Sequence, residues 1–383
     1  MKPFIDNQSP TQSSQAYIPR QPNEVEINAK LEQMRQWLSH TGAKAIRLRG
    51  TDWFAWATAG GSNTVLLTSE VGVADIVVTA HDALMLTDDI EADRMRDEEL
   101  PAVYRLQVCR WVQSHELQPA HNRFVASLAD GGSVLSDRPQ LGELPLPAIA
   151  LMHKLLLCDA EQERYRALGR DAALAMSEVL CEAQPDWTEY QLAGAGAQAL
   201  YRRGIDPALI LAAGERRLPL YRHPMPSAEP IGQRAMLVFC ARRNGLYASL
   251  TRFVTFGKAS SRLPLLLDIE AAALDACRAD TPLSAVYQVL SDAYRSAGDA
   301  AAIEEHHQGG VTGYLAREAI ANPASTLILQ NRMALAFNPS CTGLKVEDTF
   351  LLQPSGLENL TIDPSWPATT VSGRARPLWL ERQ

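Results

Sequence analysis

The order of helix-like and strand-like patterns after residue 150 restricts the folds that this chain can adopt. The pattern is helical at 159–180, 188–203 and 281–298, and strand-like at 235–241, 247–256, 332–339 and 347–354. Thr188 and Gln191 have the spacing of a helix-capping box, and Gly204 marks the end of that helix. Asp159 and Gln162 repeat the spacing. Because strands and long helices alternate in blocks, we predict an α+β arrangement, a curved sheet backed by helices.

Residues 25–150 show a separate α/β pattern. Short β-rich runs occur at 44–48, 64–68, 74–79 and 82–87, with Gly and Asp residues between them. Residues 130–147 are rich in prolines and turn residues, which indicates a boundary near 150. We therefore expect a flexible tail over 1–24, a smaller domain over 25–150 and a larger domain over 151–383.

Length, charge and cysteine usage narrow the functional classes. The 383 residues are enough for two domains. Asp and Glu outnumber Lys and Arg by 44 to 36, and this acidic balance argues against a nucleic-acid partner. No apolar stretch reaches the roughly 18 residues that cross a bilayer, so no membrane partner is expected. Six scattered cysteines without a C-x-x-C pair, and no signal-peptide core, indicate a reducing cytoplasm.

Four short segments of the second half carry a more specific signal. They are RHP at 222–224, NGLYASLTR at 244–252, HHQGGVTGYLARE at 306–318 and AFNPSCTGLKVEDT at 336–349. In order and spacing they resemble the motifs of the pita-bread family, which includes aminopeptidase P, prolidase, methionine aminopeptidase and creatinase. The resemblance implies a pita-bread C-terminal domain, a smaller creatinase-like α/β N-terminal domain, and a homodimer like those of creatinase and prolidase.

The same motifs show where this chain departs from the family. Metal-dependent members hold two divalent ions with two Asp, one His and two Glu, which are suitable ligands for hard cations. The corresponding positions here are Val238, Ser249, Gly310, Asn338 and Glu347. Only one of the five is a carboxylate. We therefore predict that the chain carries no dinuclear metal site and uses no cofactor.

Other polar positions of the family's cleft are retained. His223 and His306 match its two non-ligand histidines, and Arg317-Glu318 stands where the family has a His-Glu pair. The resemblance offers creatinase as a precedent, since creatinase hydrolyses a C–N bond without metal, using a histidine and glutamates. We therefore expect four catalytic residues and six substrate-binding residues. The catalytic candidates are His223, His306, Glu318 and Glu347, and the substrate-binding candidates are Ser249, Arg252, His307, Tyr314, Arg317 and Asn338.

The buried position expected for Glu347 requires a partner, because an unpaired buried carboxylate costs several kcal/mol. Arg252, Arg317 or a histidine is the expected partner. A purely structural ion pair at Glu347 is the alternative, as is a solvated turn at residues 304–307.

Three alternative functions are compatible with these residues. The first is a metal-independent enzyme that cleaves a C–N bond of a small amino-acid-like or amide substrate by histidine and glutamate acid-base chemistry. The second is a metal-dependent Xaa-Pro aminopeptidase or dipeptidase with a nonstandard site, using ligands from His306, His307, Glu318 and Glu347. The third is a non-catalytic relative that binds peptides or proteins.

Overall fold

The structure is a computed structural model, and it describes residues 22–115, 119–140 and 142–382. Of the predicted flexible tail, residues 1–21 lie outside the described part of the chain. The first helix begins at Glu24, after Asn23, whose side chain caps it. Within the described ranges, no helix is both long enough and apolar enough to cross a membrane.

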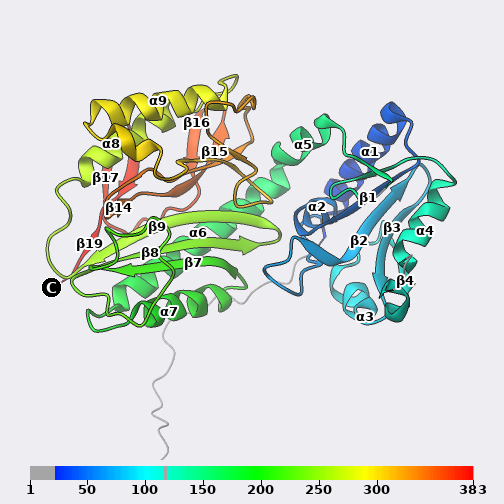
Figure 1. Ribbon diagram of the computed structural model, residues 1–383, viewed down its shortest axis with the longest axis horizontal. Coiled ribbons are helices and arrows are strands. Elements are labelled where there is room, and N and C mark those ends of the chain that lie inside the picture. Colours follow the sequence, from blue (N-terminus) through cyan, green and yellow to red (C-terminus); the bar gives the residue numbers. More distant parts are fainter. Residues whose placement is uncertain (1–21, 116–118, 141, 383) are drawn as a thin grey trace, which may run out of the picture.

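The N-terminal part of the molecule is a six-stranded sheet with helices on both faces (Figure 1). The strand order is β4-β3-β2-β1-β5-β6, and β1 pairs antiparallel with β2 and parallel with β5. Its elements are α1 (Glu24–Thr41), β1 (Ala45–Gly50), α2 (Thr51–Ala57), β2 (Val71–Thr79), β3 (Ala83–Asp88), α3 (Ala92–Arg94), β4 (Arg105–Cys109), α4 (Ala120–Ala129), β5 (Val134–Ser136), β6 (Glu143–Pro145) and α5 (Ala148–Leu155).

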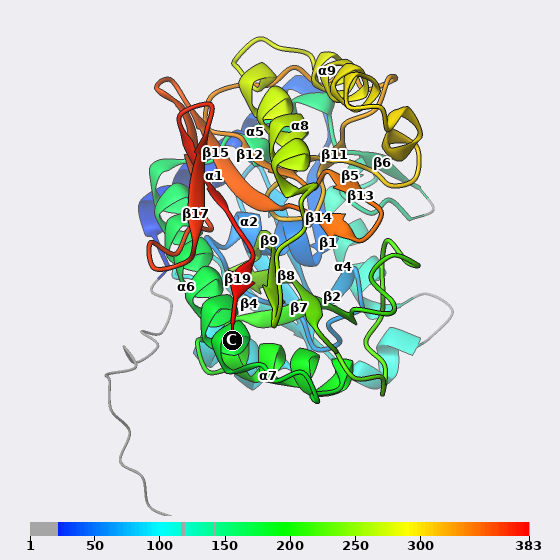
Figure 2. The ribbon, with the colours of Figure 1, turned by 90° about the vertical axis from the view of Figure 1, so that its left-hand side faces the viewer.

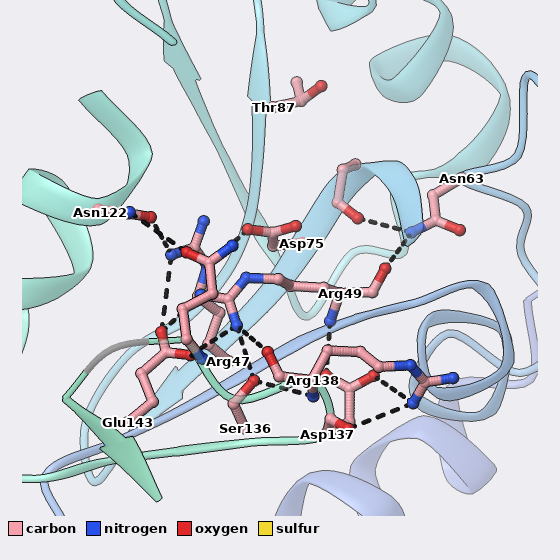
Figure 3. A network of polar contacts seen from close by, with 12 residues as sticks. Arg47, Arg49, Asn63, Asp75, Thr87, Asn122, Ser136, Asp137, Arg138 and Glu143 are labelled. Atoms are coloured by element: carbon pink, nitrogen blue, oxygen red, sulfur yellow. Dashed lines mark hydrogen bonds and ion pairs between the residues drawn. The ribbon is translucent and has the colours of Figure 1, made fainter. Parts of the chain in front are cut away.

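Side chains alternate between the two faces of this sheet. Ile46 and Leu48 of β1 pack in one core with α1 and α2, whereas Ala45 packs in a second core with α4. A polar network fixes one end of the sheet (Figure 3). There, Arg49 of β1 donates to both carboxylate oxygens of Glu143 on β6, at 2.6 and 2.5 Å. This bidentate pair ties the central strand to the edge of the sheet.

The C-terminal part contains two main sheets, ordered β19-β9-β8-β7 and β11-β10-β12-β15-β16. Helices α6 and α7 pack on the first sheet, and α8 and α9 pack on the second (Figures 1 and 2). Its helices are α6 (Asp159–Glu182), α7 (Glu189–Tyr201), α8 (Leu263–Ala276) and α9 (Leu283–Ser296). Its strands are β7 (Asp206–Gly214), β8 (Arg234–Arg243), β9 (Leu246–Thr255), β10 (Gly309–Thr312), β11 (Ala319–Ile320), β12 (Ala334–Phe337), β13 (Ser340–Cys341), β14 (Leu344–Lys345), β15 (Asp348–Gln353), β16 (Gly356–Asn359), β17 (Ala368–Val371), β18 (Arg374–Pro377) and β19 (Leu380–Glu381).

Most of the predicted elements are present, with two local corrections. The capping box of Thr188 and Gln191 is confirmed at α7. The box at α6 lies one residue earlier than predicted and is formed by Cys158 and Glu161. The predicted strand at 64–68 is wrong, because this segment is a turn with exposed apolar side chains. Among the described residues this segment takes part in no strand pairing, although its β-branched residues favour strands.

Buried ion pairs join the N-terminal part to the loop that follows β10. The Lys154 ammonium lies 2.7 Å from an Asp52 oxygen and 2.8 Å from a Glu318 oxygen. The other Glu318 oxygen accepts the backbone N–H groups of Tyr314 and Leu315. These contacts fix the loop over 313–318 against the N-terminal part.

Candidate functional site

The candidate site lies where the two C-terminal sheets meet. Glu347 follows β14 and directly precedes β15. Its backbone forms an isolated antiparallel bridge with Thr251 of β9, and the Thr251 N–H donates to the Glu347 carbonyl at 3.1 Å. The loop over 313–318 brings Arg317 to the same point.

Two cationic side chains surround the Glu347 carboxylate. Arg317 Nη2 lies 2.9 Å from Oε1, and Lys345 Nζ lies 2.9 Å from Oε2. The Thr251 hydroxyl also donates to Oε2, at 2.9 Å. Burial by itself would raise the pKa of Glu347, but Lys345 and Arg317 outweigh burial and hold it at about 2. Glu347 therefore stays ionised, and its carboxylate is fully engaged in ion pairs with these two cations.

Three histidines gather beside this cluster. His306 Nε2 lies 2.8 Å from His223 Nε2, and the His306 and His307 rings stack with centroids 4.5 Å apart. Burial, with Lys345 and the neighbouring imidazoles adding to it, lowers the pKa of His306 to about 3. Burial and Arg317 lower the pKa of His307 to about 4, and burial also lowers that of His223. At neutral pH these imidazoles are uncharged.

The remaining predicted site residues divide into two groups. Ser249 lies near the cluster, where its hydroxyl is 3.4 Å from Arg317 Nη1, and the Asn338 amide oxygen is buried without a partner among the described residues. The other three have different contacts. Arg252 pairs with Asp348, Glu318 pairs with Lys154, and the Tyr314 hydroxyl donates to Glu161. No contact between these three and the histidines appears among the described residues.

Comparison with known proteins identifies the family. The sequence profile of metallopeptidase family M24 matches residues 163–354, which are 192 of the 383 residues. The chain belongs to metallopeptidase family M24. No curated protein matches it in sequence.

Solved structures of M24-like proteins superimpose on most of the chain, and the predicted α+β pita-bread fold is confirmed. The Xaa-Pro dipeptidase from Bacillus anthracis has a TM-score of 0.72 at 17% identity, covering 88% of this chain and 98% of its own. The prolidase from Pyrococcus horikoshii OT3 has a TM-score of 0.73 at 14% identity, covering 88% and 98%. The N-terminal domain of FACT complex subunit SPT16 from Cicer arietinum (chickpea) has a TM-score of 0.64 at 13% identity, covering 89% and 97%. At these identities the similarity shows the fold alone.

The residues of this M24 chain do not fit a dinuclear metal centre. Val238 and Ser249 offer no carboxylate, and the carboxylate of Glu347 is already paired with two cations. The motif resemblance assigns the family's histidine ligand to Gly310, and a Cβ added there would collide with the Ala319 carbonyl oxygen. No side chain fits at that position without moving β11. Hard cations need several free oxygen ligands, and this arrangement does not supply them.

In the part of the chain that the structure describes, two groups of side chains have the proximity that a single metal ion needs. The ligand atoms of His223, His306 and His307 all lie within 4.8 Å of one another. This group differs from the ligand set predicted from the sequence, because His223 takes part and Glu318 and Glu347 do not. The second group, Glu26, Cys158 and Glu161, is already paired with Lys30 and Arg164.

Sequence reasoning missed Lys345 as a site residue. Lys345 stands two residues before Glu347, and residues two apart on an extended chain point to the same side. That spacing is the signal that would have placed its ammonium beside the Glu347 carboxylate.

Proposed function

We propose that this M24 protein is a hydrolase that cleaves a C–N bond of a small amino-acid-like, amide or short-peptide substrate without a metal ion. The observation that carries this proposal is the pair of uncharged histidines, His223 and His306, beside a carboxylate that is saturated by Arg317 and Lys345. The two side-chain cations supply positive charge in the region where other family members hold metal ions.

The histidine pair has the geometry for proton transfer. With the two Nε2 atoms 2.8 Å apart, one nitrogen must donate and the other must accept, so a single proton lies between the rings. As water attacks the substrate carbon, one imidazole takes the proton from the water. The C–N bond then breaks as the leaving nitrogen takes a proton from the imidazolium. His306 is buried and His223 is exposed, so His223 is the ring that exchanges protons with solvent.

Glu347, Arg317 and Glu318 have supporting roles in this proposal. Glu347 remains ionised and holds Arg317 and Lys345 in place, and Arg317 stabilises the negative charge that develops on the oxygen of the scissile group. Glu318 is a positioning residue, since it fixes the loop that carries Arg317.

A chelator-resistance assay tests the proposal. The protein, with and without excess EDTA, is given small amides, amidines and Xaa-Pro dipeptides. We expect turnover that EDTA does not reduce, and a loss of about 100-fold or more in kcat for His306→Asn and His223→Asn. His81→Asn, a change at an exposed histidine, is the matched control. Turnover that disappears with EDTA would reject metal independence.

The three-histidine cluster favours a second candidate, an Xaa-Pro peptidase with a single metal ion held by His223, His306 and His307. Neutral imidazole is a suitable ligand for zinc, whereas the nearby Lys345 and Arg317 oppose a cation. The third candidate is a binding protein without turnover. For such a protein, His306→Asn would change ligand affinity or stability with no activity to lose.

The assembly and location of the protein are further parts of the proposal. We propose a homodimer in the cytoplasm, with domains over 25–150 and 151–383, as the resemblance to creatinase and prolidase implies. The free cysteines of the described residues agree with a reducing compartment. Light scattering that gives the mass of one chain would reject the dimer.

A further inference from the structure

A small pocket with both apolar and polar lining residues opens beside His306 at the β13–β14 hairpin. It has a volume of about 20 Å³, and His306, Ser340, Lys345 and Arg222 are among the residues that line it. This volume holds about one water-sized group. The pocket therefore accommodates one oxygen atom of a ligand whose other atoms lie outside it.

Ser340 and Lys345 are fixed side by side at this pocket. They are direct partners in the antiparallel β13–β14 pair, so their side chains point to the same face. The hairpin turn has only two residues, Thr342 and Gly343, which sets the register, and Gly343 has a φ of 73°. The backbone of Ser340 is further held by Tyr294, whose hydroxyl accepts from Ser340 N at 2.8 Å and lies 2.9 Å from Ser340 O.

Several polar groups at the pocket lack partners. The Ser340 hydroxyl and His306 Nδ1 are buried and have no hydrogen-bond partner among the described residues. The Lys345 side chain is 7% exposed, and the one ion pair found for its ammonium within the described ranges is that with Glu347. An ammonium has three donors, so two remain for a ligand. Buried polar groups left in this state are costly unless a ligand or water completes them.

The local charge specifies the sign of the ligand. Lys345 and Arg317 carry two positive charges, and Glu347 carries one negative charge, which leaves one positive charge in excess. Arg222 does not change this balance, because it pairs with Glu305. The excess charge therefore favours an anionic oxygen over a neutral one.

We propose that Lys345 and Ser340 form a receptor for a carboxylate group of the substrate, with one carboxylate oxygen entering the pocket beside His306. That the ligand is a substrate rests on the proposed function. The inference adds the substrate class, which is a molecule with a free carboxylate. The receptor itself is a binding site that is testable without turnover.

Formate and its neutral analogue formamide are the probes. Thermal unfolding and calorimetric titration are measured while sodium chloride is replaced stepwise by sodium formate at constant ionic strength. We expect formate to raise the Tm of the wild type in a saturable manner, and formamide to have no effect. Lys345→Met should weaken formate binding at least tenfold, and Ser340→Ala about three- to tenfold, because hydrogen bonds to a charged group are lost.

Two control variants and three outcomes separate the possible failures. Lys345→Arg should restore part of the binding, and Lys258→Met, at an exposed lysine, should leave it unchanged. Formate that does not stabilise the wild type, or that stabilises Lys345→Met equally, would overturn the receptor. If formate binds as predicted but no C–N substrate is turned over, the receptor stands and the proposed function fails. If substrates are turned over and formate neither binds nor competes, the function stands and the receptor fails.

Discussion

Glu347 and Asp348 are neighbours in the chain, and each buried carboxylate is paired with two cations, but the two clusters differ in charge balance. Asp348 lies 2.7 Å from both Arg252 and Arg376, and Arg376 also pairs with the buried Glu270. That cluster has two carboxylates for two arginines and is neutral. The Glu347 cluster has one carboxylate for Arg317 and Lys345 and keeps an excess positive charge.

The comparison teaches that pairing alone does not separate a structural ion pair from a functional one. Around Asp348, every charge has a counter-charge within the fold, and the group stabilises the meeting of β15 with β9. Around Glu347, one cation is left over, and buried atoms without partners among the described residues lie beside it. An excess buried cation is costly unless water or an anionic ligand compensates it, whereas a balanced cluster needs no further partner.

Arg376→Met should have the largest effect on stability. The change leaves Glu270 without a cation and Asp348 with Arg252 alone, and breaking a buried ion pair in this way costs about 3–5 kcal/mol. Urea unfolding monitored by circular dichroism measures the loss. A loss below about 1 kcal/mol would mean that the Asp348 cluster is not the structural one.

The pH dependence of stability probes the histidine side of the site. The folded protein lowers the pKa of His306 from 6.5 to about 3, so below pH 6.5 the unfolded chain binds a proton that the folded chain does not. The free energy of unfolding should therefore fall as the pH is lowered from 6.5 towards 3, by about 1.4 kcal/mol per pH unit for this group. Above pH 6.5, His306 does not contribute to the pH dependence of the free energy of unfolding.

His306→Asn removes this titrating group, and urea unfolding at a series of pH values should show a shallower slope between pH 6.5 and 4. The exposed His81→Asn variant serves as the control and should keep the wild-type slope. An unchanged slope in His306→Asn would contradict the buried, uncharged state of this imidazole.

Lys345→Met should have the smallest effect on stability. The variant leaves Glu347 paired with Arg317 and hydrogen-bonded to Thr251, so the cluster becomes neutral and no buried charge is stranded. We expect a change within about 1 kcal/mol in urea unfolding, in contrast to Arg376→Met. A loss as large as that of Arg376→Met would remove the distinction between the two clusters.

The fold was largely predictable from the sequence, because the four motifs and the capping box of Thr188 and Gln191 are local patterns. The prediction of a strand at 64–68 was wrong because β propensity does not reveal whether a partner strand is present. Arg317 is one of the three partners expected for Glu347. The site was less predictable, since Ser340 comes to lie beside Lys345 through the pairing of β13 with β14, and Glu318 acquires its role from a contact with Lys154 of α5.

Plasma mass spectrometry of bound manganese tests whether Arg317 and Lys345 replace the metal ions of other family members. The intact protein is loaded with excess manganese, dialysed and analysed beside Glu347→Gln. We expect less than about 0.1 ion per chain in both proteins, because a cation would meet two side-chain cations and a single, already paired carboxylate. Two manganese ions per chain in the wild type, lost in Glu347→Gln, would contradict this account.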